Sequence, residues 1–205
     1  MGLLHLFPTV IYSHDSLGIS PLESKEYIDY LNTINYTSLS SSDHISENDN
    51  LLNNSLFDNL KSNILHHCKN YLISQKHKFE DLQFSCSWAY ISKKGNIGGN
   101  LHHHSNAYVS GVYYLTEGTD LIFHDFRYEE LYGFRPEYDT PSKDPLYSYC
   151  KIPIKKDQLI LFPSNLAHAI DHIQDNKRRI SIAFNIIPKG KFGKFTSSLY
   201  INGND

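Results

Sequence analysis

The chain has 205 residues with 40% hydrophobic and 20% charged side chains and a formal net charge of -3, a composition that is typical of a folded globular protein and favours one domain over residues 1–205. Lysines and arginines are scattered rather than gathered in a stripe, so a nucleic-acid-binding surface is not expected. The sequence lacks a membrane-length apolar run and a secretory signal, and its three widely spaced cysteines favour a reducing, cytoplasmic setting.

Residues 1–80 are expected to form a strand and two supporting helices. The strand spans Leu4 to Tyr12, around a proline that suits a sheet edge because proline donates no backbone hydrogen bond. The first helix is predicted to begin after Ser20, where Ser20 and Glu23 form a capping box.

A polar segment and a second helix follow. Ser38 to Asn54 is rich in Ser, Asp and Asn and is expected to be an exposed loop. The second helix extends to about Ser74, because apolar residues recur at intervals of three and four, at Phe57, Leu60, Ile64, Cys68 and Tyr71. Its apolar face needs a sheet to cover.

From Asp81 to about residue 190 the sequence has the periodicity of β-strands. One strand is predicted where Phe84, Cys86, Trp88 and Tyr90 alternate with other residues, giving two differently filled faces. Further strands are predicted at Ala107–Leu115, Leu121–His124, Lys151–Ile154, Gln158–Phe162 and Ile180–Ile187. Short strands behind two helices predict a mainly β (α+β) fold, with a jelly-roll or barrel core over residues 81–190.

One segment between the strands is too long and irregular for a hairpin turn. Phe126 to Tyr149 contains three prolines and many tyrosines. Long loops at a barrel mouth are commonly functional, so we expect this segment to be a substrate lid.

Three histidines suggest a metal site. His102 and His104 lie two residues apart on an extended segment, so their side chains point to the same face. His168 follows a strand and a turn, and a later strand that placed it opposite would make three imidazoles converge. Three neutral nitrogen ligands suit Fe(II), Zn(II) or another first-row metal. Because the chain has 12 histidines, exposed or hydrogen-bonded histidines are the competing interpretation.

Four motifs follow one another along the chain: His102-x-His104 with Ser110-Gly111-Val112-Tyr113-Tyr114-Leu115, then Leu121-Ile122-Phe123-His124-Asp125, then Phe162-Pro163-Ser164-x-x-x-His168, and finally Arg179-Ile180-Ser181. Together they resemble a family of 2-oxoglutarate-Fe(II) dioxygenases that is common in bacteria and phages. The resemblance covers about Phe84 to Ile187. It implies a double-stranded β-helix, a jelly roll whose opposing strands hold the iron and the co-substrate between two sheets.

The resemblance also implies Fe(II) as cofactor and 2-oxoglutarate as co-substrate. The expected reaction is hydroxylation of a small-molecule or peptide substrate, with release of succinate and CO2. His102, His104 and His168 would be the metal ligands. The wider superfamily has an acidic residue where His104 stands, so Asp125 is an alternative ligand, and a water in place of His102 is another.

The far carboxylate of 2-oxoglutarate needs a cation with paired donors. Arg179 and Ser181 are two residues apart on one strand and therefore share a face, so they would bind this carboxylate. Tyr113 or Tyr114 could add a further donor. These two tyrosines are sequence neighbours on a strand and point to opposite faces, so at least one of them belongs to the core.

Two other classes of function fit the same motifs. A cupin-like enzyme would use the three histidines without a keto acid, and a non-catalytic jelly roll would bind Zn(II) through them or bind no metal. Dependence on Arg179 distinguishes the first class from the oxygenase, and metal content distinguishes the second.

Overall fold

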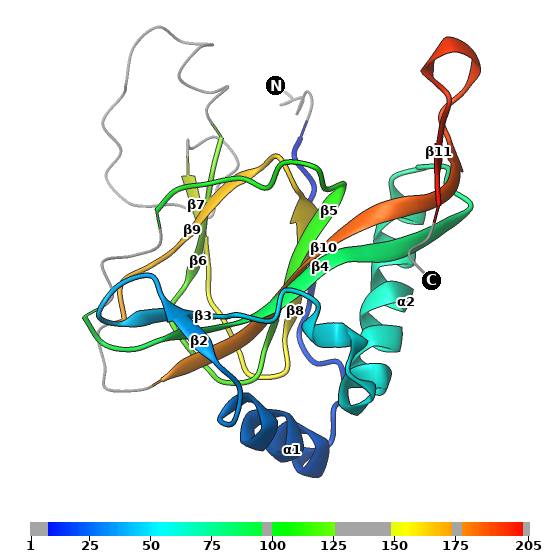
Figure 1. The fold of residues 1–205 in the computed structure, drawn as a ribbon. Helices are drawn as coiled ribbons and strands as arrows, with labels where there is room; N and C mark the ends of the chain where they lie inside the picture. The colour runs from blue at the N-terminus through cyan, green and yellow to red at the C-terminus, as the bar shows by residue number, and fades with distance from the viewer. Residues whose placement is uncertain (1–7, 96–99, 126–148, 174–177, 203–205) are drawn as a thin grey trace, which may run out of the picture.

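The computed structural model describes residues 8–95, 100–125, 149–173 and 178–202, and Figure 1 shows their arrangement. The helices are α1 (Pro21–Leu31) and α2 (Asp58–Ser74), with short 3-10 helices η1 (Leu51–Asn53), η2 (Ser55–Phe57) and η3 (Phe195–Ser197). The strands are β1 (Tyr12–His14), β2 (Tyr36–Ser38), β3 (Asp43–Ser46), β4 (Asp81–Ser92), β5 (Val109–Tyr114), β6 (Leu121–His124), β7 (Tyr149–Ile152), β8 (Leu159–Pro163), β9 (Ala167–Ile170), β10 (Arg179–Phe192) and β11 (Leu199–Ile201).

Both predicted helices are confirmed. At the start of α1 the Glu23 backbone N–H donates to Ser20 Oγ at 3.2 Å, and the Ser20 backbone N–H donates to the Glu23 carboxylate at 3.2 Å. Such a cap is worth about 1 kcal/mol. The apolar positions of α2 are buried, as their spacing predicts. No helix in the described part of the chain is long and apolar enough to span a membrane.

The strands form two antiparallel sheets. The large sheet has the order β1-β8-β5-β10-β4-β3-β2, with β11 paired to β10, and the small sheet has the order β7-β6-β9. The chain passes from β5 in the large sheet to β6 in the small one, from β7 back to β8, and from β9 back to β10. This winding between two facing sheets is the predicted double-stranded β-helix.

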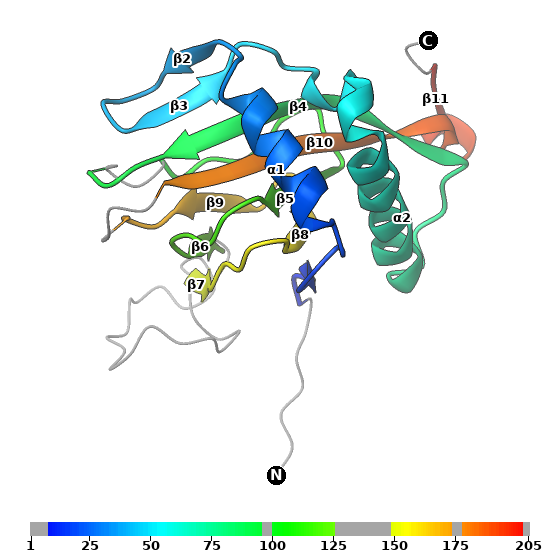
Figure 2. The same cartoon turned by 90° about the horizontal axis from the view of Figure 1, so that it is seen from below.

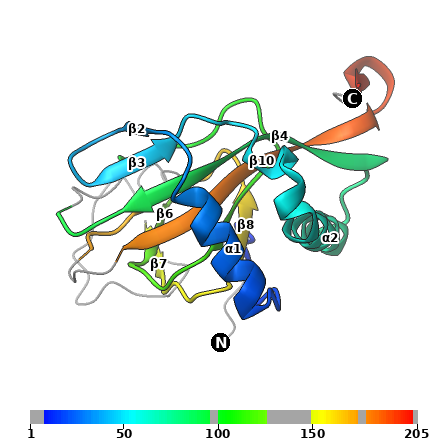
Figure 3. The same ribbon diagram turned by 60° about the horizontal axis from the view of Figure 1, so that its bottom comes forward.

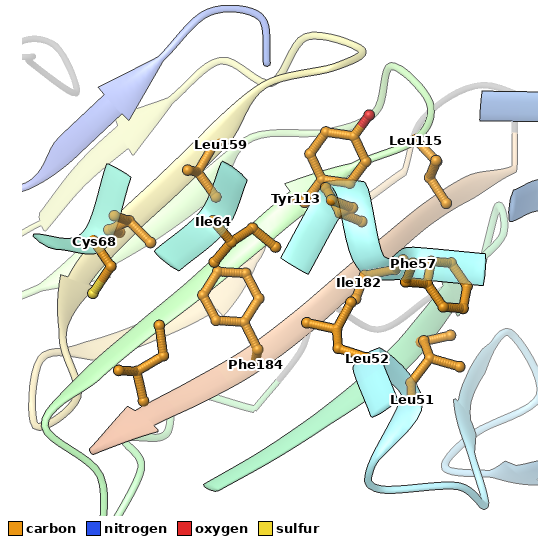
Figure 4. Packing of buried hydrophobic residues seen from close by; sticks show 14 of the residues in the cluster. Leu51, Leu52, Phe57, Ile64, Cys68, Tyr113, Leu115, Leu159, Ile182 and Phe184 are labelled. Atoms are coloured by element: carbon orange, nitrogen blue, oxygen red, sulfur yellow. The ribbon is translucent and has the colours of Figure 1, made fainter. Parts of the chain in front are cut away.

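Each face of the large sheet has its own core. On the outer face, Figure 3 shows α1 and α2 lying over β4 and β10, and Figure 4 shows helix side chains packed against Tyr113, Ile182 and Phe184. Gly111 leaves room for the Phe184 ring, because a Cβ at this glycine would lie 2.5 Å from a ring carbon. The inner core fills the space between the sheets and consists of Val112, Tyr114, Leu121, Phe123, Ile154, Ile160 and Phe162.

A β-bulge divides β4 into two parts. Asn185 on β10 pairs with Cys86, but the next residue, Ile186, pairs with Phe84, so Ser85 is the extra residue. Strict alternation predicts that Phe84 shares a face with Cys86 and Trp88, but the bulge moves Phe84 to the opposite face. There it packs edge-on against Phe184, with 5.5 Å between ring centroids.

The prediction of an exposed loop from Ser38 to Asn54 is wrong. Figure 2 shows the β2–β3 hairpin continuing the large sheet beyond β4. Its polar side chains bond within the protein: Asp43 is 4% exposed, and its Oδ1 accepts a hydrogen bond from Ser92 Oγ at 2.6 Å. Polar composition here reflects internal hydrogen bonding rather than exposure.

Two other predictions concern segments that are partly outside the described residues. The first strand is Tyr12–His14 and pairs with β8, whereas residues 8–11 of the predicted Leu4–Tyr12 strand are not in a strand. The predicted lid, Phe126 to Tyr149, lies outside the described residues except for Tyr149, which begins β7.

Candidate metal and co-substrate site

Backbone hydrogen bonds bring the three histidines together. His102 and His168 form an isolated antiparallel bridge, in which the His102 N–H donates to the His168 carbonyl at 3.1 Å and the His168 N–H donates to the His102 carbonyl at 2.8 Å. The His104 N–H donates to the Ser164 carbonyl at 2.8 Å. The chain ahead of β5 is thereby held against β9, a strand that the sequence analysis did not delimit.

The imidazoles converge on one point. His102, His104 and His168 each have a ring nitrogen within 4.8 Å of the others, and the Nε2 atoms of His104 and His168 are 3.2 Å apart. His102 Nδ1 lies 2.7 Å from the Asn100 carbonyl, and His168 Nδ1 lies 3.0 Å from the Leu166 carbonyl. A carbonyl only accepts, so both Nδ1 atoms carry the proton and both Nε2 atoms keep a lone pair, as metal ligation requires.

Burial keeps two of these rings uncharged. Burial, with a smaller effect from His102 and His103, lowers the pKa of His104 to about 4. Burial is also the main reason that the pKa of His168 is lowered to about 3. Protonation to the charged imidazolium is therefore disfavoured near neutral pH, and each ring keeps one nitrogen with a lone pair.

The alternative ligand Asp125 is placed differently. It follows β6, and it does not belong to the group of three converging ligands found among the described residues. His103, between the two converging histidines, is exposed.

A second cluster contains buried donors that lack acceptors. Arg179 is 2% exposed, and its guanidinium carbon lies 5.0 Å from the centre of the Tyr114 ring. Within the described ranges, Arg179 Nε and Nη1, the Tyr114 hydroxyl and Ser181 Oγ have no hydrogen-bond partner. A buried cation without a carboxylate is costly, by several kcal/mol. The cluster therefore has the chemistry of an anion-binding site.

Tyr113 does not join this cluster. It packs in the outer core with the helices, and its hydroxyl donates to Asp157 Oδ1 at 2.8 Å. Tyr114, its neighbour on β5, pairs with Ser181 and faces Arg179. The opposite orientation of the two tyrosines follows from the strand period.

One cavity of about 700 Å³ contains both clusters, since its lining includes His102, His104, His168, Arg179 and Ser181. Sequence reasoning missed several other lining residues. Trp88 stacks on His104 with 5.6 Å between ring centroids and an interplanar angle of 23°. The β2–β3 hairpin supplies a wall through Leu39, Ser40, Asp43, Ile45 and Ser46.

Residues 86–185 match the family described as "Putative 2OG-Fe(II) oxygenase". This β-rich region resembles the 2-oxoglutarate-Fe(II) oxygenase family. The match extends from Cys86 on β4 to Asn185 on β10 and so includes all three converging histidines, Arg179 and Ser181. No protein of curated function matches the sequence.

Solved structures share the fold of this chain at low sequence identity. HygX from Streptomyces hygroscopicus, solved with nickel, 2-oxoglutarate and hygromycin B, aligns with a TM-score of 0.60 and 11% identity, over 88% of this chain and 84% of that one. The α-ketoglutarate-dependent epimerase SnoN from nogalamycin biosynthesis gives 0.65 and 12%, over 89% and 80%. The viral collagen prolyl hydroxylase of Paramecium Bursaria Chlorella virus-1 gives 0.54 and 14%, over 86% and 94%.

Proposed function

We propose that this protein is an Fe(II)- and 2-oxoglutarate-dependent oxygenase that hydroxylates its substrate. The observation that carries the proposal is the joint presence, in one cavity, of three convergent imidazoles and a buried arginine without a carboxylate partner among the described residues. The first cluster suits a first-row metal, and the second suits the remote carboxylate of a keto acid.

His102, His104 and His168 would hold the metal. Backbone carbonyls leave the Nε2 lone pairs of His102 and His168 available for a metal ion, and burial keeps the His104 ring uncharged. When bound, Fe(II) with 2-oxoglutarate supplies the oxidising chemistry, in which the keto acid is decarboxylated to succinate and one oxygen atom of O2 goes to the substrate. The protein binds and orients the reactants and excludes bulk water.

Arg179, Ser181 and Tyr114 would bind the far carboxylate of 2-oxoglutarate. The Arg179 guanidinium offers Nε and Nη1 as donors without a partner among the described residues, and the two hydroxyls add further donors. Ser181 pairs with both Tyr114 and Tyr90, so these groups are held between three adjacent strands. Rigid strands fix donor positions more firmly than a loop would.

The reacting group of the substrate would approach beside Trp88, which is half-buried and stacked on His104. The solved proteins of similar fold include a prolyl hydroxylase and an epimerase, so the product has to be identified chemically. Hydroxylation predicts a mass gain of one oxygen atom, whereas epimerisation leaves the mass unchanged. Cys68 and Cys86 are free thiols, which supports a reducing, cytoplasmic setting.

The test is an anaerobic titration of the chelator-treated protein with Fe(II) and then 2-oxoglutarate. We expect the weak visible charge-transfer band of a keto acid chelated to iron, together with quenching of Trp88, the only tryptophan in the chain. Arg179→Met should abolish the response to 2-oxoglutarate while retaining Fe(II) binding. Fe(II) binding without a band in the wild type would favour the cupin-like alternative, and failure to bind metal would refute the proposal.

A further inference from the structure

Asn185 lies at the centre of a buried hydrogen-bonded network behind His104. It is 7% exposed and sits on β10 at the bulge, where it pairs with Cys86 on one side and Ser110 on the other. Ser110 Oγ donates to Asn185 Oδ1 at 2.7 Å, and Asn185 Nδ2 lies 3.2 Å from Cys86 Sγ and 3.1 Å from His104 Nδ1.

This arrangement determines where the proton of His104 lies. The Asn185 NH2 group donates to His104 Nδ1, so the ring proton is on Nε2. His104 Nε2 then donates to His168 Nε2 across 3.2 Å, and His168 Nδ1 donates to the Leu166 carbonyl. The four groups form one continuous chain of hydrogen bonds that share a direction.

Ligation by His104 Nε2 requires the other tautomer, with the proton on Nδ1 and the lone pair on Nε2. An acceptor must then face Nδ1, and Asn185 supplies one if its carboxamide turns over and presents Oδ1. The partners of the amide allow this. The Ser110 hydroxyl and the Cys86 thiol can each donate or accept, so neither opposes the turned amide.

We propose that Asn185 is a positioning residue that selects the tautomer of His104, and that turning its carboxamide allows His104 Nε2 to bind a metal ion. The inference rests on the proposed function in one respect, because it takes His104 as a metal ligand. Asn185 itself binds neither metal nor keto acid. Its effect is expected in metal affinity and in the state of the ring.

Two variants separate the possible roles of the amide. Asn185→Asp keeps an acceptor and removes the donor, so it should hold His104 in the Nδ1-protonated form and bind Zn(II) at least as tightly as the wild type. Asn185→Leu offers neither group and should weaken Zn(II) binding by about 10- to 100-fold, the usual cost of losing a group that orients a histidine ligand. Asn70→Asp is the matched control, because Asn70 contacts His66 Nε2 at 3.0 Å on the exposed surface of α2.

The experiment combines Zn(II) competition against a chromophoric chelator with 15N NMR of histidine-labelled protein, which distinguishes the two ring tautomers. Before Zn(II) is added, we expect the Nε2-protonated form of His104 in the wild type and the Nδ1-protonated form in Asn185→Asp; after addition, both should be Nδ1-protonated. Asn70→Asp should match the wild type in both measurements.

Identical tautomers in the wild type and Asn185→Asp before addition would overturn the inference, and so would wild-type Zn(II) affinity in a folded Asn185→Leu variant. If Asn185→Leu does not fold, the tautomer comparison decides alone. If the wild type binds no Zn(II), the proposed function is in error, whereas the tautomer comparison still tests Asn185.

Discussion

Replacing Arg179 with methionine should separate ligand binding from stability. Loss of a large buried side chain ordinarily destabilises a protein by about 2–5 kcal/mol. Here the replacement also removes a buried cation whose Nε and Nη1 have no acceptor within the described residues. Exchanging buried charge for apolar volume is often neutral or stabilising by about 1–4 kcal/mol. The lost contact with the Tyr114 ring offsets up to about 2 kcal/mol of that gain. We therefore expect an unchanged or slightly higher melting temperature without 2-oxoglutarate.

The rise in melting temperature that 2-oxoglutarate causes should, in contrast, be smaller in the variant than in the wild type. At 100 times its Kd a ligand stabilises the wild type by about 2.7 kcal/mol, which is a rise of about 5–11 °C in a protein of this size. Two charge-assisted hydrogen bonds are worth about 3–6 kcal/mol, so Arg179→Met should bind 2-oxoglutarate about 10²- to 10⁴-fold more weakly. The rise at the same concentration should then fall below about 2 °C.

The assay is thermal unfolding with Co(II), with and without 2-oxoglutarate, and Arg178→Met is the control because the neighbouring Arg178 donates to Asn32 Oδ1 at 2.8 Å instead. A variant that loses more than about 2 kcal/mol of stability, or one that keeps the full response to 2-oxoglutarate, would refute this reasoning.

Three further predictions follow from individual contacts. Tyr114→Phe should weaken 2-oxoglutarate binding by about 2- to 10-fold. Tyr113→Phe should leave that affinity unchanged and lower the free energy of unfolding by about 1 kcal/mol, because the hydrogen bond to Asp157 is lost. Calorimetry measures the two affinities, and urea unfolding measures the two stabilities. A Cβ at Gly118 would lie 2.9 Å from Arg179 Cγ and Cδ, so Gly118→Ala should weaken 2-oxoglutarate binding without changing Co(II) affinity, and equal effects on both ligands would contradict this. Burial, followed by the charges of His14 and His66, lowers the pKa of His67 in the folded state. As the pH falls, the unfolded chain therefore protonates its His67 imidazole before the folded protein does, and the free energy of unfolding decreases below neutrality. His67→Gln should reduce this decrease between about pH 7.5 and about pH 5.5 by less than about 1 kcal/mol, as measured by urea unfolding.

The sequence predicted those parts of the fold that depend on local pattern. The capping box at Ser20, the buried stripe of α2 and the strands β4, β5, β6, β7, β8 and β10 follow from side-chain period and capping chemistry. The same rule placed Arg179 and Ser181 on one face and Tyr113 opposite Tyr114. Which tyrosine faced the arginine was not decided by period, because that depends on the register of β5 against β10.

The features that escaped prediction depend on long-range pairing. No local sequence pattern predicts the bulge at Ser85, yet the bulge moves Phe84 to the outer face and sets the pairing of Asn185 with Cys86. The β2–β3 hairpin looked like a loop because its Ser and Asp side chains serve as internal hydrogen-bond partners. The contact between Trp88 and His104 could not be predicted from local pattern, because it depends on the bridge between His102 and His168.

The unbroken course of β10 has a consequence for ligand choice. Arg179, Ser181 and Asn185 lie on one strand that is paired on both sides, so the spacing between the proposed carboxylate-binding and metal-binding ends of the cavity is set by the rise of a β-strand, about 3.3 Å per residue. Such a backbone gives way very little along its length. The distance between the two ends is therefore fixed. The cavity should reject dicarboxylic keto acids one methylene shorter or longer than 2-oxoglutarate, even though their charged groups are the same.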